Sequence, residues 1–399
     1  MTQRRSFWMG RWVSDRDELF SMGAVLGFSL ALGTWTLTMP LLALEAGWDA
    51  AGIGVLAMLA AVSHLATRLQ MAWLLGRVTD RLLLLVACGL LALPYALLLV
   101  SQDGWAFVFG QMFNGAARAT FWTASQTHVV RGNRAPVRAL AQLHVLNSAG
   151  QVVGPVAAGA LLAAAPAAAV GLGLLAALVG GVACLGLAAL PIYARLSGNR
   201  LTWWWRSRGV GVAAWASFSA GGWRTLLSSY VPVVLDGAGH NTGLIGLLVG
   251  LSDAASIVAA AAVARLDRGA LMLTLRFGTI ATGAGLAAVG LVPESVAAVG
   301  LALGVSGIGA GMISTLGPAI AAESAAGESQ GAAIALTGTF RATALLAVPA
   351  GVAALLLVVG LSTALVTVGL ALTLPGVAAS LQRTHSSASV GAQSGPRRD

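Results

Sequence analysis

The sequence predicts an all-α polytopic membrane protein with twelve transmembrane helices in two six-helix bundles. The 399 residues are 57% hydrophobic and only 9% charged, and the mean hydropathy is +0.84. Because a soluble domain carries roughly 25% charged residues, most of this surface must face lipid. The apolar residues also form long runs, and the basic residues fall between alternate runs.

The apolar runs have the length that a bilayer requires. A hydrocarbon core of about 30 Å needs about 20 helical residues. Twelve such runs are separated by charges or turn residues, and the first is too long for the core of a signal peptide. The predicted spans are 19–44, 51–75, 82–101, 105–127, 139–164, 168–192, 209–235, 241–264, 270–292, 295–320, 331–356 and 360–381.

The basic residues predict the orientation of the spans. All 23 are Arg; if both termini are cytoplasmic, 18 lie in cytoplasmic segments, 5 lie within spans and none lies in an external loop. This asymmetry follows the positive-inside rule. We therefore expect a multi-pass protein with both termini in the cytoplasm. The absence of Lys beside abundant Ala and Gly favours a bacterial inner membrane.

The same pattern divides the chain into five parts. They are a cytoplasmic N-terminal segment at 1–18, an N-terminal six-helix bundle at 19–192, a cytoplasmic linker at 193–208, a C-terminal six-helix bundle at 209–381 and a disordered cytoplasmic tail at 382–399. The net charge of +9 is explained by Arg residues flanking the spans. We therefore expect contact with the lipid bilayer rather than with nucleic acid, and a monomer.

Several kinds of chemistry are excluded by the residue types. A chain without Lys has neither a Walker-type phosphate loop nor a Schiff-base lysine. Cys88 and Cys184 lie in apolar runs, as small core residues do. The five histidines are scattered along the sequence. The predicted spans contain no nucleophile–base pair and no pair of carboxylates near mid-membrane depth. The sequence thus predicts no enzyme activity, no cofactor and no metal.

Two short motifs recur at equivalent places in the two halves. The loop between the second and third spans contains Gly76, Asp80 and Arg81, where the glycine permits a tight turn and the acid can cap or pair with a helix end. The loop between the eighth and ninth spans repeats the acid–base pair as Asp267 and Arg268. Repetition in register is typical of duplicated transporter halves.

The fifth span contains closely spaced small residues and a proline. Gly150, Gly154 and Gly159 allow close approach of another helix, and Pro155 removes a backbone hydrogen bond and bends the helix. With the two loops and the topology, this motif resembles the major facilitator superfamily, and specifically its antiporters, over residues 15–381. The resemblance implies that these loop and span-5 residues serve conformational change.

The resemblance also implies a secondary active transporter that works by alternating access, with spans 1, 4, 7 and 10 lining the cavity. We expect efflux of a small amphipathic or anionic metabolite or drug in exchange for protons. An importer of an organic anion, and a non-transporting membrane sensor on the same fold, are the alternatives. The span-5 motif favours the exporter, whereas the excess of Arg would suit uptake equally well.

Charged residues inside a predicted span are expected to have a structural or functional role, because placing each charge at the bilayer centre costs at least ~2.5–3.5 kcal/mol. Arg118, Arg224 and Arg341 fall near mid-depth, where transporter sites lie. Either they receive an anionic substrate, or backbone carbonyls and Asp253 satisfy them. The other candidate substrate-binding residues are Gln111, Asn114 and Trp122, which share a face of span 4 with Arg118, and Trp35 and Trp223 as apolar walls.

Proton coupling requires a group that titrates. Asp253 is the only acid at mid-depth, and His64 and His144 are the other candidates. In superfamily exporters an Arg often stands four residues before a Gly in span 4. Here Gln111 takes that place before Gly115, so the sequence leaves the coupling residue open.

The orientation can be tested by labelling single cysteines in a chain lacking Cys88 and Cys184. A cysteine at Ser101 should react with a membrane-impermeant thiol reagent from outside the cell, and one at Ser207 only from inside, because Arg residues mark the cytoplasmic side. Labelling of position 207 from outside would overturn the orientation.

Overall fold

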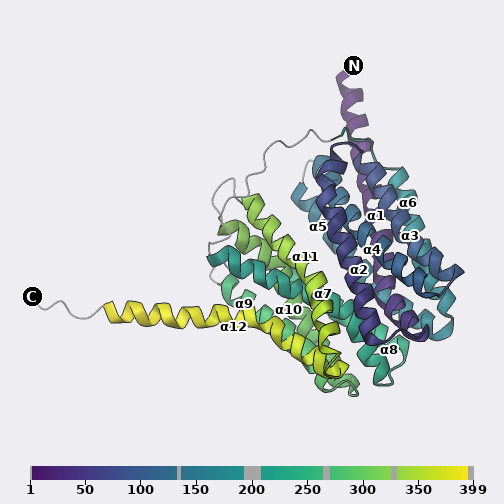
Figure 1. Ribbon diagram of the computed structural model, residues 1–399. Coiled ribbons are helices and arrows are strands. Elements are labelled where there is room, and N and C mark those ends of the chain that lie inside the picture. Colours follow the sequence, from purple (N-terminus) through teal and green to yellow (C-terminus); the bar gives the residue numbers. More distant parts are fainter. Residues whose placement is uncertain (1, 133–135, 193–207, 264–269, 325–329, 394–399) are drawn as a thin grey trace, which may run out of the picture. The chain divides into compact units, whose positions relative to one another are not determined.

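The computed structural model describes residues 2–132, 136–192, 208–263, 270–324 and 330–393. Within these residues the chain is helical, without a strand, and the twelve predicted spans each coincide with one helix (Figure 1). The helices are α1 Thr2–Glu45, α2 Ala50–Leu75, α3 Asp80–Val100, α4 Gly104–Gly132, α5 Pro136–Ala164, α6 Pro166–Leu185, α7 Arg208–Gly237, α8 Thr242–Val263, α9 Leu271–Leu291, α10 Val296–Glu323, α11 Gln330–Leu355 and α12 Leu361–Gln393. The predicted all-α fold class is confirmed.

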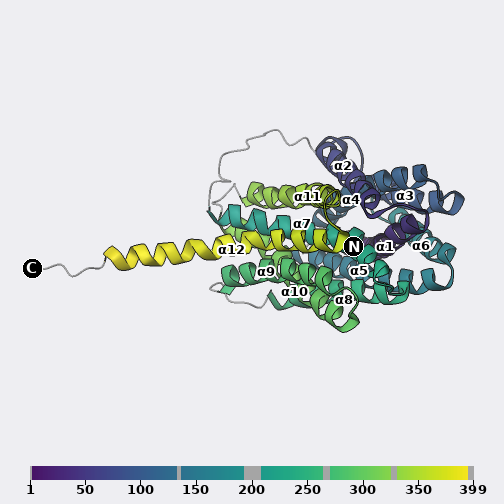
Figure 2. The same ribbon diagram turned by 60° about the horizontal axis from the view of Figure 1, so that its bottom comes forward.

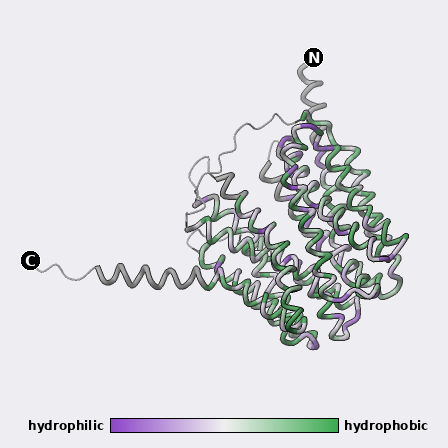
Figure 3. The backbone as a smooth tube through the Cα atoms, in the orientation of Figure 1, coloured by the Kyte–Doolittle hydropathy of each residue, from purple (hydrophilic) through white to green (hydrophobic). Residues whose placement is uncertain are grey.

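Hydrophobic residues cover most of the helical length, and hydrophilic residues form short stretches (Figure 3). Nine of the described helices are long and apolar enough to cross a membrane. The other three are α4, α7 and α12. α4 and α7 are long enough, with 29 and 30 residues. They are less apolar than the other helices because each carries an arginine and further polar side chains along a predicted span. The apolar part of α12 is shorter, Leu361–Val377.

The ends of the chain extend the helices beyond the predicted spans. α1 includes the segment predicted to precede the first span, and α12 is helical across residues 382–393, where the sequence predicts a disordered tail. The predicted linker at 193–208 lies almost entirely outside the described residues.

The helices form two compact units. The first comprises Met1–Asn199, Leu226–Ala254 and Val352–Leu357, and the second comprises Arg200–Thr225, Ala255–Gly351 and Val358–Asp399. The division therefore differs from one made at the linker, because much of α8 and the last turns of α7 belong with α1–α6. The boundary of the two six-helix bundles remains a prediction.

In the first unit, α1 packs on α5 and α6, α3 on α4 and α6, and α2 on α4. Figure 2 shows α1 beside α5 and α6 from a second direction. Aromatic residues fill the contact of α1 with α4, where the rings of Phe28 and Phe121 stack with centroids 3.8 Å apart. In the second unit α9 packs on α10 and α12, and an apolar core includes Leu275 of α9 and Ile313 of α10.

The glycines of the span-5 motif lie where α5 crosses other helices. A Cβ added to Gly154 would stand 2.6 Å from the carbonyl carbon of Gly33 in α1, and one on Gly150 would stand 2.6 Å from Ser29. One helical turn further along, the Thr242 hydroxyl at the start of α8 donates a hydrogen bond to the Gly159 carbonyl at 3.1 Å. The motif thus brings the backbones of α1 and α8 against α5.

Replacement of Gly154 by Ala should therefore destabilise the protein. The added methyl would push α1 and α5 apart, at a cost of about 1–3 kcal/mol in the free energy of unfolding. Gly171→Ala on α6 is the matched control, because a Cβ there meets no atom within 4 Å and Ala favours the helix by up to ~1 kcal/mol. Both free energies can be measured by unfolding in detergent; equal values for the two variants would contradict the close contact.

Candidate functional site

Polar side chains follow one face of α4 in the first compact unit. Gln111, Asn114 and Ser125 are each 3% exposed, and Arg118 is half-buried. Their spacing of three, four and seven residues places them along one side of the helix. These four polar residues therefore share one side of α4.

Gln111 connects this polar face to α1. Its Oε1 atom accepts hydrogen bonds from Trp35 Nε1 and from Asn114 Nδ2, each 3.3 Å long. The Trp35 ring also meets Tyr95 of α3 edge-on, with centroids 5.1 Å apart, and the Tyr95 hydroxyl donates to the Ala31 carbonyl. Trp35 is 3% exposed, so it acts as a packed side chain with one polar anchor.

Asn114 has an unsatisfied atom. Its Oδ1 is buried and has no hydrogen-bond partner among the described residues. Leaving a buried acceptor unpaired costs about 1–3 kcal/mol, and such an atom in a native structure calls for an explanation. A hydrogen-bond donor on a bound molecule would satisfy it.

Aromatic and glycine contacts surround the polar face. Trp122 is half-buried and meets the rings of Phe28 and Phe121 edge-on. On α2, His64 is 9% exposed, and a Cβ on Gly115 of α4 would stand 3.0 Å from its backbone nitrogen. The candidates of α1, α2 and α4 therefore belong to one closely packed group of helices.

Asp253 also lies in the first unit. It is 5% exposed on α8. Gly250 lies one turn before it, and a Cβ added to Gly250 would stand 3.1 Å from the Val152 carbonyl oxygen of α5. α8 is thus close to α5 on the side next to Asp253. Gln151 of α5 is 7% exposed. His144 lies on α5, but its side chain is outside the described part of the chain.

The candidates of the second unit lie on α7 and α11. Trp223 is 4% exposed, and its Nε1 has no hydrogen-bond partner among the described residues. The neighbouring Arg224 is half-buried, with its guanidinium 6.0 Å from the Trp223 ring centroid. The two helices cross at Gly221, beside the backbone carbonyl of Arg341. The Arg341 side chain itself is exposed.

The loop motif of the first half belongs to a polar cluster at the helix ends. Gly76 ends α2, and Thr79 caps α3 by accepting a hydrogen bond from the Leu82 N–H. Asp80, which is 1% exposed, pairs with Arg131 of α4, with Nη1 and Oδ2 3.1 Å apart. Arg81 is half-buried. The second loop, with Asp267 and Arg268, lies outside the described residues.

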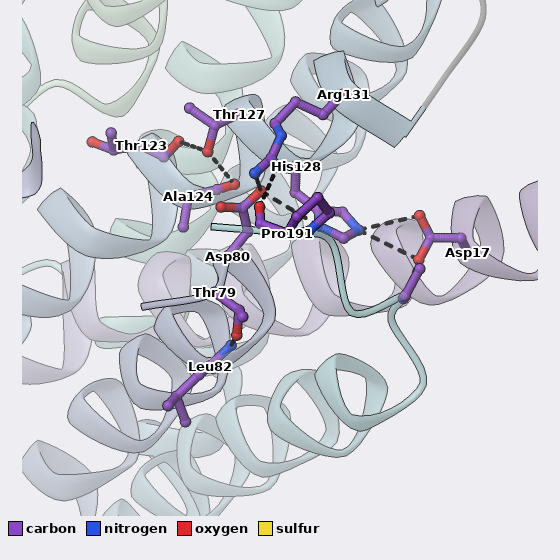
Figure 4. A network of polar contacts seen from close by, with 11 residues as sticks. Asp17, Thr79, Asp80, Leu82, Thr123, Ala124, Thr127, His128, Arg131 and Pro191 are labelled. Atoms are coloured by element: carbon purple, nitrogen blue, oxygen red, sulfur yellow. Dashed lines mark hydrogen bonds and ion pairs between the residues drawn. The ribbon is translucent and has the colours of Figure 1, made fainter. Parts of the chain in front are cut away.

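The same cluster contains two residues that the sequence analysis missed. His128 of α4 contacts Asp17 of α1, with Nε2 and Oδ2 3.1 Å apart (Figure 4). Asp17 also accepts a hydrogen bond from the Ala188 N–H at 2.6 Å, and Arg131 donates to the Pro191 carbonyl. The cluster therefore joins α1, α3 and α4 to the segment after α6. The spacing of His128 and Arg131 on one face was the available signal.

The described residues form twelve helices, nine of them long and apolar enough to cross a membrane, and several carry polar side chains on buried faces, as in a polytopic membrane protein. The chain matches the Major Facilitator Superfamily over residues 20–349. It belongs to this superfamily, and its fold is that of a membrane transport protein.

Solved transporter structures share the fold at low sequence identity. An auto-inhibited POT family peptide transporter has a TM-score of 0.73 at 12% identity, covering 96% of this chain and 98% of that one. A mutant of the nucleoside transporter NupG has 0.71 at 11% identity, with 92% and 98% covered. A bacterial homologue of the human lysosomal transporter Spinster, inward-facing and unoccupied, has 0.66 at 10% identity, with 93% and 95% covered. No curated protein sequence matches the chain.

The Gln111 contacts predict a measurable coupling between α1 and α4. Gln111→Ala leaves two buried donors without their acceptor and should lower the free energy of unfolding by about 1–3 kcal/mol per donor. Trp35→Phe removes one donor, so the double variant should lose less than the sum of the two. Gln126→Ala, on the exposed side of α4, should stay within about 0.5 kcal/mol. Additive losses would show that the two side chains do not interact.

Proposed function

We propose that this transporter is a secondary active exporter, which moves a small amphipathic or anionic metabolite or drug out of the cell in exchange for protons. Substrate and proton would bind in turn as the protein opens to either side by alternating access. The proposed setting is a bacterial inner membrane, with both termini in the cytoplasm and a monomer as the working unit. Bundles at 19–192 and 209–381 would provide the two moving parts.

The polar face of α4 is the observation on which the proposal depends. Asn114 Oδ1 is a buried acceptor without a partner among the described residues, and Asn114 is hydrogen-bonded to Gln111. Arg118 follows one turn later on the same face. A polar molecule with both a donor and an anionic group would match this pair of residues, since Arg guanidinium binds carboxylate and phosphate in a fork geometry.

The charge of the mid-membrane residues favours an anionic group. At the depth that the sequence predicts for Arg118, Arg224 and Arg341, it has a single acid, Asp253. A positive excess in low dielectric attracts an anion more strongly than it would in water. Arg118 and Arg224 stand on α4 and α7, helices that line the cavity in this superfamily, so we propose that they contact the substrate, with Trp122, Trp35, Trp223 and Arg341 around it.

Asp253 is the leading candidate for the coupling proton. It is a buried carboxyl on α8 and the only acid at its depth, and intramembrane acids in transporters commonly relay protons. His64 and His144 are the other candidates. The small residues Gly150, Gly154, Pro155 and Gly159, with the loops at Gly76, Asp80 and Arg81 and at Asp267 and Arg268, would serve the change between conformations.

The proposal can be tested with purified protein in liposomes carrying an imposed pH gradient. A panel of anionic and amphipathic compounds should be driven against the direction of proton flow. Transport in the same direction as the protons would favour an importer, and binding without transport would favour a sensor.

Substrate affinity of arginine variants then tests the site. Arg118→Lys and Arg224→Lys should weaken binding because an ammonium lacks the guanidinium fork, and the Ala variants should weaken it further, by about 2–5 kcal/mol or roughly thirty-fold or more. Arg68→Lys, at an exposed position of α2, is the control and should bind normally. Thermal stability separates lost binding from lost folding. If both Ala variants bind normally or merely unfold, the anionic-substrate proposal is wrong.

A further inference from the structure

A short chain of hydrogen bonds in the first unit links Trp35 of α1 to Gln111 and Asn114 of α4. Trp35 Nε1 and Asn114 Nδ2 both donate to Gln111 Oε1, over 3.3 Å each. The three side chains are each 3% exposed, so water has little access to these contacts. The direction of each hydrogen bond is therefore set by the three side chains themselves.

The indole at the end of this chain can act in one sense only. Its N–H is a donor and the ring has no acceptor, whereas an amide side chain can present either its oxygen or its nitrogen. The ring is also held in place. It meets Tyr95 edge-on, with centroids 5.1 Å apart, and Gly110 of α4 leaves space for it, since a Cβ there would stand 3.4 Å from Trp35 Cη2. The indole N–H therefore stays directed at Gln111.

A fixed donor on Trp35 determines the orientation of both amides. Turning the Gln111 amide over would set its NH2 group against the indole N–H, donor against donor. Turning the Asn114 amide over alone would set its Oδ1 atom against Gln111 Oε1, acceptor against acceptor. In the observed orientation Asn114 uses Nδ2 for Gln111 and keeps Oδ1 for another partner.

This remaining atom of Asn114 is an unpaired acceptor. Oδ1 is buried and has no hydrogen-bond partner among the described residues. A ligand that brings an N–H or O–H group to this atom removes the cost of the unpaired acceptor, whereas a ligand that brings a methyl group or a carbonyl oxygen does not. Arg118 is half-buried on the same face, one turn or about 6 Å further along the helix axis.

We propose that Asn114 selects substrates that carry an N–H or O–H donor about one helical turn from their anionic group, and that Trp35 is the positioning residue that sets this preference through Gln111. The substrates are thus hydroxy or amino acids whose donor stands apart from the carboxylate, rather than acids without a donor. The inference rests on the proposed function only in assigning the anionic group to Arg118. Trp35 acts through its N–H, which an apolar wall would not require.

Equilibrium binding to the purified full-length protein in detergent tests the preference with three probes of similar shape. 4-Aminobenzoate offers a donor, 4-methylbenzoate has a methyl group of similar size in its place, and 4-formylbenzoate offers only an acceptor. Wild-type protein should bind 4-aminobenzoate roughly tenfold to a hundredfold more tightly than the other two, because each of those leaves Asn114 Oδ1 unpaired. Equal affinities for 4-aminobenzoate and 4-methylbenzoate would overturn the proposal.

Two variants separate the roles of the side chains. Asn114→Leu has no acceptor, so 4-aminobenzoate should lose its advantage over 4-methylbenzoate. Trp35→Phe keeps an aromatic ring but removes the N–H, so both amides can turn over and Asn114 can direct its NH2 group at the ligand. 4-Formylbenzoate should then gain about tenfold in affinity relative to 4-aminobenzoate. If Trp35 acts only by packing, all three probes should weaken alike with unchanged ratios, and its assigned role would be wrong.

Trp105→Phe is the matched control, since Trp105 is 46% exposed at the start of α4, and it should keep the wild-type ratios. If Trp35→Phe does not fold, Gln111→Met removes the same constraint on Asn114 and should give the same gain for 4-formylbenzoate; an unchanged ratio would equally overturn the proposal. So would a wild-type protein that binds none of the three probes. These measurements use no pH gradient, so a protein that shows the expected ratios but moves no compound against a gradient would refute proton-coupled export alone.

Discussion

Inside the hydrocarbon of a bilayer, polar groups must find their partners within the protein, and this constraint governs the whole chain. Helices satisfy the backbone. Many hydroxyl groups are satisfied by the same helix, as where Thr34 donates to Leu30, Thr120 to Ala116 and Thr279 to Leu275, each to the carbonyl four residues earlier. The Gln111 carbonyl and the His128 ring instead meet partners on α1. These larger side chains therefore help to determine which helices lie together.

Glycine provides the second means of joining helices. Since lipid is as apolar as a leucine side chain, helices in a membrane associate largely through close packing and interhelical hydrogen bonds. α1 and α5 use both: Gly33 lies against Gly154, and one turn away the Ser29 hydroxyl donates to Asn147 Oδ1 at 3.2 Å. The contact continues from Gly159 to α8. α5 thus holds Asp253's helix in the same compact unit as α1.

The sequence predicts what local pattern determines. Long apolar runs predict the helices, and the spacing along span 4 predicts that Gln111, Asn114 and Arg118 share a face. Which helix that face meets is not a local property. Trp35 and Gln111 are 76 residues apart, and Asp17 and His128 are 111 apart, so periodicity gave no sign of either contact. The sequence places Arg341 at mid-depth, but it does not predict how far its side chain is exposed, and in the structure that side chain is exposed.

Charge and depth are related along α4. The ionisable groups Asp17, Asp80, His128 and Arg131 gather at the helix ends, where burial of charge is less costly than at the bilayer centre. Toward the middle, neutral amides accompany a single Arg118. His128 and Arg118 are ten residues apart on one helix, or about 15 Å along its axis. A helix is a rigid element, so a change in the contact of His128 with α1 would tilt or shift the same body that carries Arg118. A change at the helix end and a change near the middle would then be coupled through α4 itself, without a chain of intermediate side chains.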